Sequence, residues 1–340
     1  TTQVRGGLGV FTSRLPLVWP GGTYNNNGVT GGFNFEFGQA FEADVNNQFE
    51  DPAPGTGGTG GNIDLFAKNF KLPQVAKYTV SVDQKLPVWG LIATVDLLYT
   101  DVLQDIYYEN LNLKGPVGTL NGADNRPVYD RRDEIDDTYG RIILASNTSK
   151  GYSYNGTLTL RKPLTNGFQG QVSYTYGESE KVFDGTSSQN SSQWRNIQSV
   201  NGKNSNIPLS RSDFALGSRI NGNVSYEFEY GGDFGGKTTV GLFYDGAQSS
   251  PYSYTYREGR DILNDDSRDN ALMYVPANSG EIAFSGDATE QVRQWELLNY
   301  YIENDDYLST RRGQYAERNG SRGPWNHIVD LKFLQDFYIK

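Results

Sequence analysis

The sequence predicts an all-β protein, an antiparallel transmembrane β-barrel, from three observations. Apolar and polar residues alternate along segments of about ten residues, which exceed the common strand length of about five or six. Short turns within hairpins alternate with long segments between them. The 340-residue chain has 23 tyrosines, 40 glycines and a mean hydropathy of −0.60, which favours strands and turns over a large helical core.

Three predicted hairpins carry this alternation, and each has an apolar, tyrosine-rich face and a polar face. In residues 150–179, Leu158 and Tyr174 belong to the apolar face. The other hairpins cover residues 78–99 and 219–245. The predicted turns are LPVWG (86–90), PLTNG (163–167) and GGDFGG (231–236).

In a membrane barrel, the apolar face of each strand meets lipid and the polar face meets the lumen. We therefore expect lipid to contact Val172, Tyr174, Val224, Tyr226, Val240 and Leu242. We expect the lumen to contact Gln171, Ser173, Asn223, Ser225 and Thr239. Tyrosines gather near the strand ends, as in an interfacial aromatic belt.

Long segments, residues 101–150, 177–213 and 245–307, follow the three hairpins. Loops longer than about 15 residues are uncommon in compact soluble domains. Outer-membrane barrels place long loops outside the cell and short turns in the periplasm, so we expect that orientation here.

One loop segment has helical spacing. Val292, Trp295, Leu298 and Ile302 recur every three or four residues, and Asp287 precedes them as a candidate N-cap. The sequence therefore predicts a short helix within the last long loop.

Composition excludes several classes of function. The chain has no cysteine, so disulfides and cysteine-based zinc or redox sites are excluded. Its net charge of −10 argues against nucleic acid as a partner. No apolar run is long enough for a transmembrane helix, and the N-terminus does not resemble a signal peptide.

Several segments carry a family resemblance. RRGQYAERNG (311–320), DGTSSQNSSQW (184–194) and LSRSDFALGSRI (209–220) resemble the C-terminal region of Oar-like TonB-dependent outer-membrane receptors of Bacteroidetes type. The resemblance spans nearly the whole chain. It implies a barrel of about 22 strands, an N-terminal plug inside it, and energy from the inner-membrane TonB complex.

The chain departs from that full pattern. No plug domain or TonB-contacting segment is recognisable, and a closing strand is expected after LQDFYIK (334–340). We therefore interpret residues 1–340 as the C-terminal part of a larger barrel, because an open sheet edge in lipid would leave backbone groups unsatisfied.

Two segments contain candidate ligand-binding residues, which are Trp194, Arg195, Arg311, Arg312, Tyr315 and Arg318. Polar residues around an exposed tryptophan can hold sugars or peptides, and an arginine cluster can contact a ligand or a plug. The alternatives are an ordinary ordered loop around Trp194 and a charge network, including Glu317 and Arg322, that fixes the register of the wall.

A candidate calcium site groups Asp261, Asp265, Asp266 and Asp269 in one loop, because calcium takes several oxygen ligands. The spacing lacks the glycine of related loops, so a solvated acidic loop is the alternative, and no other cofactor is expected. His327 is the only histidine and no nucleophile motif accompanies it, so we expect no catalytic residue and no enzymatic activity.

Three functional hypotheses remain. The first is a TonB-dependent transporter in the Gram-negative outer membrane that takes up a peptide, an oligosaccharide or a chelate. The second is a barrel scaffold or partner in an envelope assembly such as a secretion or motility complex, and the third is a secreted carbohydrate-binding β-protein. The expected partners are outer-membrane lipid and lipopolysaccharide, the TonB complex through the plug, and an outer-membrane lipoprotein or envelope complex.

Overall fold

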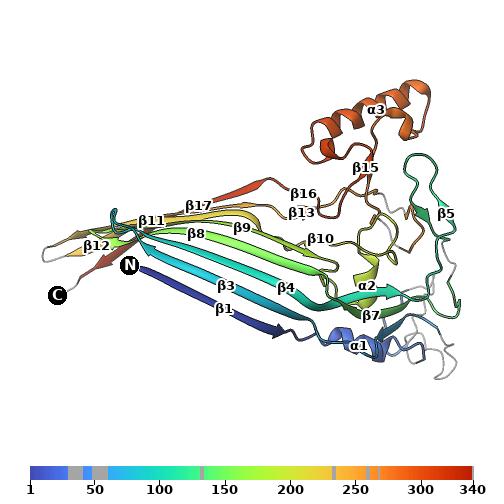
Figure 1. Cartoon of the computed structure of the whole chain (residues 1–340), viewed down its shortest axis with the longest axis horizontal. Coiled ribbons are helices and arrows are strands. Elements are labelled where there is room, and N and C mark those ends of the chain that lie inside the picture. Colours follow the sequence, from blue (N-terminus) through green and yellow to red (C-terminus); the bar gives the residue numbers. More distant parts are fainter. Residues whose placement is uncertain are drawn as a thin grey trace.

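The computed structural model shows a long, curved antiparallel sheet with loops gathered at one end (Figure 1). It describes residues 1–29, 41–47, 60–130, 134–231, 235–257, 261–266 and 269–338. The main path of the sheet runs β1-β3-β4-β8-β9-β11-β12-β17, and it is not closed, because β1 and β17 are its edges. These strands are β1 (Thr2–Thr12), β3 (Gln74–Lys85), β4 (Ile92–Asn110), β8 (Gly151–Thr165), β9 (Phe168–Lys181), β11 (Gly217–Tyr230), β12 (Gly236–Gln248) and β17 (Trp325–Phe337).

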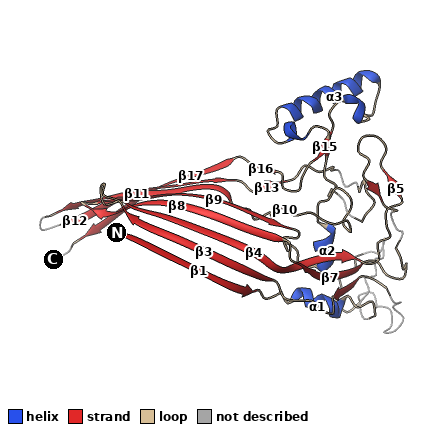
Figure 2. Cartoon of the chain, viewed as in Figure 1, coloured by secondary structure: helices blue, strands red, loops and turns tan. Residues whose placement is uncertain are grey.

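Shorter elements cover the loop end (Figure 2). The short strands are β2 (Ile63–Phe66), β5 (Gly118–Thr119), β6 (Pro127–Val128), β7 (Ile142–Thr148), β10 (Ser210–Arg211), β13 (Pro251–Tyr252), β14 (Tyr274–Val275), β15 (Gln314–Tyr315) and β16 (Ser321–Arg322). The helices are α1 (Val18–Asn25), α2 (Asn190–Arg195) and α3 (Ala288–Glu303), with 3-10 turns η1 (Ser279–Glu281) and η2 (Leu308–Arg311). Among the described residues, no helix combines the length and the apolar character needed to cross a membrane.

All three predicted hairpins are confirmed, with longer strands than expected. Strand β4 runs for 19 residues, because its loop-end part continues past β8 to pair with β7. Only Asn166 and Gly167 lie between β8 and β9, and both have positive φ, 52° and 78°, as a tight hairpin turn requires. The turns at residues 86–90 and 166–167, the N-terminus and the C-terminal end of β17 lie at the end of the sheet opposite the loops (Figure 1). Residues 232–234 of the third predicted turn lie outside the described residues.

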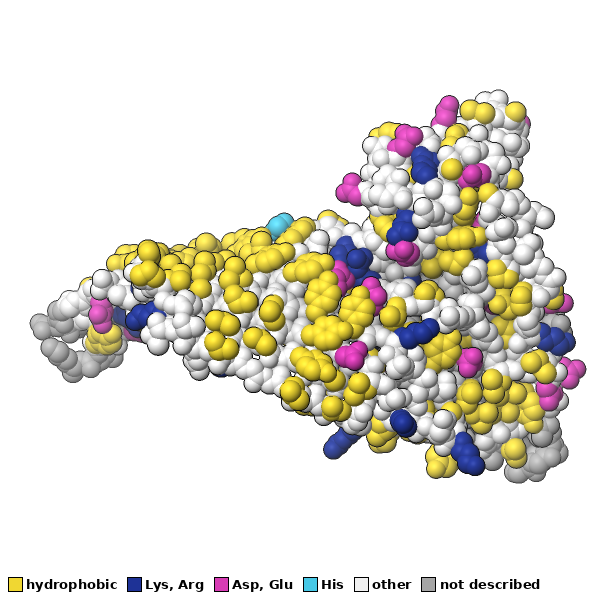
Figure 3. Space-filling view, in the orientation of Figure 1, with side chains coloured by type: hydrophobic (Ala, Val, Ile, Leu, Met, Phe, Trp, Pro, Cys, Tyr) yellow, Lys and Arg dark blue, Asp and Glu magenta, His cyan; other side chains and the backbone are white. Residues whose placement is uncertain are grey.

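One face of the sheet, the outer face, is apolar and uncovered. Leu97, Leu158 and Val172 are 54%, 49% and 48% exposed, although they lie at the centre of the sheet. Figure 3 shows hydrophobic side chains spread over the long strands. An exposed apolar surface of this extent indicates contact with a non-aqueous partner, and the alternation that produces it agrees with the predicted lipid-facing set.

Aromatic side chains border this apolar band at both ends. The turn-end belt includes Trp89 stacked on Phe168, with ring centroids 5.3 Å apart. The loop-end belt includes Tyr154 and Tyr176, whose centroids are 6.4 Å apart. From Phe168 to Tyr176, β9 advances eight residues, which span about 26 Å along the strand at ~3.3 Å per residue. At the ~40° tilt of strands in outer-membrane barrels this is about 20 Å across the membrane, somewhat less than their apolar band of ~25 Å.

The conventional core lies in the loop end rather than in the sheet. One cluster joins Trp19 of α1, Tyr108 of β4, Ile143 of β7 and Trp194 of α2. The predicted loop helix is confirmed as α3, and the side chain of Asp287 caps it by accepting a hydrogen bond from the Glu290 backbone at 2.9 Å.

Candidate functional site on the inner wall and in the loop cluster

The inner face of the sheet is lined by hydroxyl and carboxylate side chains that bond to one another across strands. Thr157 and Thr175 are 2.9 Å apart, and Thr159 and Ser173 are also 2.9 Å apart. Asp83 accepts a hydrogen bond from Thr94 at 2.7 Å. The wall therefore presents many polar groups that satisfy one another, although Leu98, Phe243 and Ile328 also lie at inner positions.

Ion pairs add to this polar inner face. Arg5 contacts Asp83 at 2.8 Å, and Arg219 contacts Asp245 at 2.8 Å. Such exposed pairs contribute little stability, with a median of about 0–1 kcal/mol. Their role is to keep this face wet, as expected of a wall that lines a lumen.

A pocket of about 510 Å³ lies where the inner face meets the loops. Its lining combines Lys77 and Lys181 with Asp105, Trp19 and Tyr108. Lys181 lies 3.3 Å from Asp105. Lys77 is in phase with the polar residues of β3, which places the pocket on the lumen side.

The hydroxyl of Tyr108 has no hydrogen-bond partner among the described residues, and burial raises its pKa. A buried polar group without a partner gains when a ligand supplies one. The pocket can therefore hold a polar ligand by hydrogen bonds, charge and aromatic contact.

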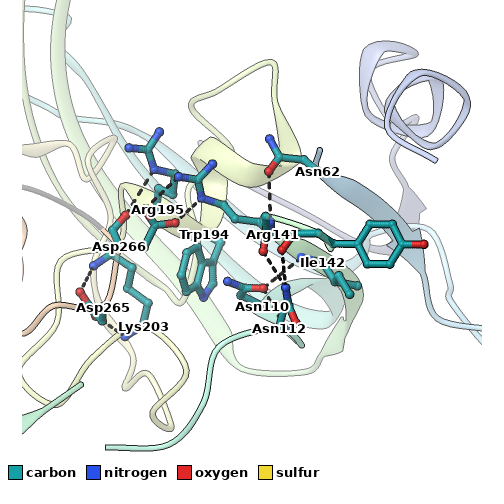
Figure 4. A network of polar contacts seen from close by, with 12 residues as sticks. Asn62, Asn110, Asn112, Arg141, Ile142, Trp194, Arg195, Lys203, Asp265 and Asp266 are labelled. Carbon is teal, nitrogen blue, oxygen red and sulfur yellow. Dashed lines mark hydrogen bonds and ion pairs between the residues drawn. The ribbon is translucent and has the colours of Figure 1, made fainter. Parts of the chain in front are cut away.

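The structure corrects the prediction that Trp194 is exposed to ligand. Trp194 is fully buried in the core cluster, and its Nε1 donates to Asn204 Oδ1 at 2.8 Å (Figure 4). Asn204 Nδ2 also donates to the Asn110 carbonyl at 2.7 Å. Trp194 therefore anchors α2 to β4. Its polar neighbours in the sequence suggested that it was exposed, but α1, β4 and β7 pack around it and bury it.

The acidic loop is tied to cationic side chains. Asp265 and Lys203 form a buried pair at 2.6 Å, and Arg141 Nη2 donates to Asp266 at 2.9 Å (Figure 4). Arg195 is part of the same network, since its Nε donates to the Asp266 carbonyl at 3.4 Å.

Asp261 and Asp269, the other two candidate calcium ligands, also have contacts of their own. Within the described ranges, no group of three or more His, Cys, Asp or Glu side chains is placed to hold a metal ion. The calcium prediction remains untested, although Asp265 and Asp266 already have cationic partners.

The arginine cluster divides into different environments. Arg311 pairs with Glu317 at 2.6 Å and lies over the Tyr307 ring. Arg312 donates to the Pro276 carbonyl at 3.1 Å. Both therefore hold loops together, while parts of their side chains remain accessible.

Arg318 is buried and donates to the carbonyls of Lys181 and Val182, at the end of β9. Burial lowers its pKa, and the negative charges of Asp184 and Asp213 offset this only in part. Arg322 donates to the Ala215 carbonyl at 2.9 Å and pairs with Glu178 at 3.2 Å. Arg322 pairs with a strand carboxylate, as the alternative of a charge network expects, whereas Arg318 bonds to backbone carbonyls. Contact of this cluster with a ligand or a plug stays a prediction.

Arg126 is a structural residue that sequence reasoning missed. It is buried between the rings of Tyr256 and Tyr315, 5.5 and 4.7 Å from their centroids, and pairs with Asp124 at 2.7 Å. Tyr315 also packs edge-on against Tyr274. These contacts join three loops distant in sequence, so no local pattern could have identified them.

His327 lies on the outer face, where its Nδ1 is 2.8 Å from the Tyr244 hydroxyl and its ring stacks on Trp325. It is therefore part of the loop-end aromatic belt.

Comparison with protein families gives one finding. A family model described as an outer membrane beta barrel domain matches residues 1–340. No curated protein and no solved structure gives a match to the chain.

Proposed function

The chain belongs to the outer membrane beta barrel domain family, and we propose that it serves there as part of a TonB-dependent transporter. The family places the chain in an outer membrane, which agrees with the apolar outer face between two aromatic belts. The observation that supports transport is the wet, pocketed inner wall. A wall built only to anchor a protein has no need of a lumen-side pocket of about 510 Å³.

We further propose that the sheet is one section of a larger barrel and that residues 1–340 form the C-terminal part. In the described residues, β1 and β17 each pair on one side only. Unpaired backbone groups at such edges are costly in lipid. Further strands beside β1 and β17 would satisfy them, and the plug would lie against the inner wall.

The proposed mechanism involves no covalent chemistry and no catalytic residue. A peptide, an oligosaccharide or a chelate binds at the loops and the inner pocket, where Lys77, Lys181 and Asp105 supply charge. The TonB complex acts on the plug, which rearranges and releases the ligand to the periplasm. In this proposal outer-membrane lipid and lipopolysaccharide surround the outer face. An outer-membrane lipoprotein is a further proposed partner, and we propose no nucleic-acid partner.

An uptake experiment tests this proposal. Cells of the source Gram-negative bacterium, with and without the gene, receive fluorescein-labelled peptides, labelled oligosaccharides or ferric chelates. We expect one class to accumulate only in cells that contain the protein, and a protonophore to abolish the accumulation. Equal accumulation of every class in both strains, or accumulation that a protonophore leaves unchanged, would contradict TonB-dependent uptake.

One observation favours a second candidate, a scaffold in an envelope assembly. Helix α3 stands off the sheet at the loop end (Figure 1), and Leu297, Tyr300 and Tyr301 are 56%, 68% and 53% exposed. Such a surface suits a protein partner. Co-purification of a large complex at fixed stoichiometry, lost in Leu297→Ser, would support this role, whereas the family match argues against the third hypothesis, a secreted soluble protein.

A further inference from the structure

Two hollows meet on the outer face at the loop-end tyrosine belt. The first, which we call the groove, has a volume of about 450 Å³ and is lined by apolar residues such as Val80 and Leu97. The second, which we call the pocket, has about 850 Å³ and is lined mainly by polar residues of the loops. Tyr154 and Tyr176 line both hollows, so the two form one continuous amphipathic surface.

The groove exists because a glycine interrupts the apolar face. Gly156 lies in register between Leu97 of β4 and Tyr176 of β9. A Cβ at this position would come within 3.2 Å of Leu97 Cδ2, so a larger side chain would take up the space that glycine leaves open. The groove lies inside the apolar band and therefore suits a hydrocarbon chain.

The pocket lies directly beyond the belt, on the loop side. The strand residues Tyr152, Glu178 and Glu180 form its floor, in phase with the outer face. Arg211, also in the lining, pairs with Glu178 at 3.0 Å. Its hydroxyl and amide groups come from the loops and include those of the exposed Asn201 and Asn206.

The charges of the pocket select the headgroup. The lining has three carboxylates, of which Glu178 pairs with Arg211 and Arg322, Glu317 pairs with Arg311, and Glu180 forms no ion pair among the described residues. Arg318 is committed to backbone carbonyls and Arg211 to Glu178, so neither cation is free to hold a phosphate. The Glu180 carboxylate, the amides and the aromatic rings instead suit a hydroxyl-rich headgroup, whose hydroxyls donate hydrogen bonds and whose apolar faces contact the tyrosines.

We propose that this surface binds a glycolipid, with one acyl chain in the groove and the saccharide headgroup in the pocket. The inference goes beyond uptake and rests on the assignment of the apolar face to lipid. It locates a lipid site on the outside of the wall, separated from the lumen by the sheet.

Lipid retention tests the proposal. The full-length protein is placed in nanodiscs of phosphatidylethanolamine and phosphatidylglycerol with diglucosyldiacylglycerol, which has no phosphate, as the only glycolipid, and native mass spectrometry counts the lipids it retains. We expect retained glycolipid, and about tenfold weaker retention in Gly156→Leu, which fills the groove, and in Glu180→Gln, which weakens the pocket.

Gly222→Leu is the matched control, because Gly222 lies on the same face, opposite Val172 and outside both hollows, and should retain the glycolipid like the wild type. Circular dichroism checks folding, and Glu180→Gln decides the matter if Gly156→Leu does not fold. Equal retention in wild type and Glu180→Gln overturns the proposal, as does preferential retention of phosphatidylethanolamine. Equally tight binding of the free headgroup disaccharide would assign the pocket to a soluble saccharide and overturn the glycolipid.

Discussion

A charge at the middle of the outer face should destabilise the protein far more than the same charge on the adjacent inner residue. Val172 is the position of choice, because it lies four residues from both Phe168 and Tyr176, the belt residues of β9. At ~3.3 Å per residue, each belt is about 13 Å away along the strand, so an arginine here lies near the bilayer midplane. We expect Val172→Arg to cost about 2–4 kcal/mol.

Gln171→Arg is the matched control on the inner face. Gln171 pairs with Arg161 of β8 and Asn223 of β11, so its arginine would face a wet lumen and one like charge. Like charges directly opposite each other across strands cost roughly 0.2–1 kcal/mol. The two variants should therefore differ by at least about 1 kcal/mol.

The measurement is urea unfolding of the full-length protein in lipid vesicles, followed by tryptophan fluorescence. Equal penalties at the two positions, or a larger penalty at Gln171, would refute the assignment of faces. A loss of folding in both variants would also count against it, since the inner position should tolerate the charge.

Four further predictions follow from the loops and turns. Because the chain has no cysteine, single introduced cysteines can report which side of the membrane a loop lies on. Ser188→Cys, in a long loop, should react with an impermeant maleimide on intact cells, and Val88→Cys, in a short turn, only after permeabilisation. The reverse pattern would show that the orientation is inverted. Arg318→Lys should open the loops beyond β9, because a lysine cannot reach both carbonyls, with faster hydrogen exchange there by mass spectrometry; unchanged exchange would contradict its anchoring role. Lys203→Met should lower the thermal midpoint by leaving Asp265 buried without its cation, whereas EDTA should not; a fall with EDTA would show that calcium holds the acidic loop. Burial raises the pKa of Asp64 above its usual value, because the charged carboxylate is disfavoured in the folded state. Asp64→Asn should therefore stabilise the protein at pH 7, and this gain should shrink towards pH 4 as the carboxyl of the wild type takes up its proton. A gain that does not change with pH would contradict burial as the cause.

The hairpins were predictable because their signal is local. Alternation with period two in residues 150–179 fixes both the strands and the face that each residue occupies. Sequence reasoning missed the first and last long strands, β1 and β17, because their local pattern is weak. Three glycines dilute the pattern in β1, and in β17 the inner positions include Ile328 and Leu334, so neither segment alternates cleanly. Their pairing with β3 and β12 supplies what the local pattern lacks.

The candidate site was predicted less well, because its residues are set by contacts distant in sequence. Trp194 lies in a polar segment, and only the packing of α1, β4 and β7 around it shows that it is buried. Arg311 and Arg318 look equivalent in the sequence, yet one pairs with a carboxylate and the other with backbone carbonyls. The groove depends on Gly156 lying in register with Leu97 of a different hairpin.

The central claim is that the sheet is a membrane wall with lipid on one face and water on the other. Spin labels placed one at a time at residues 169–175 of β9, in full-length protein in vesicles, test it most directly. Collision rates with oxygen and with a water-soluble nickel chelate should alternate with a period of two, oxygen dominating at Val172 and Tyr174 and nickel at Gln171, Ser173 and Thr175. Uniform access of the nickel chelate to both sets would contradict the account.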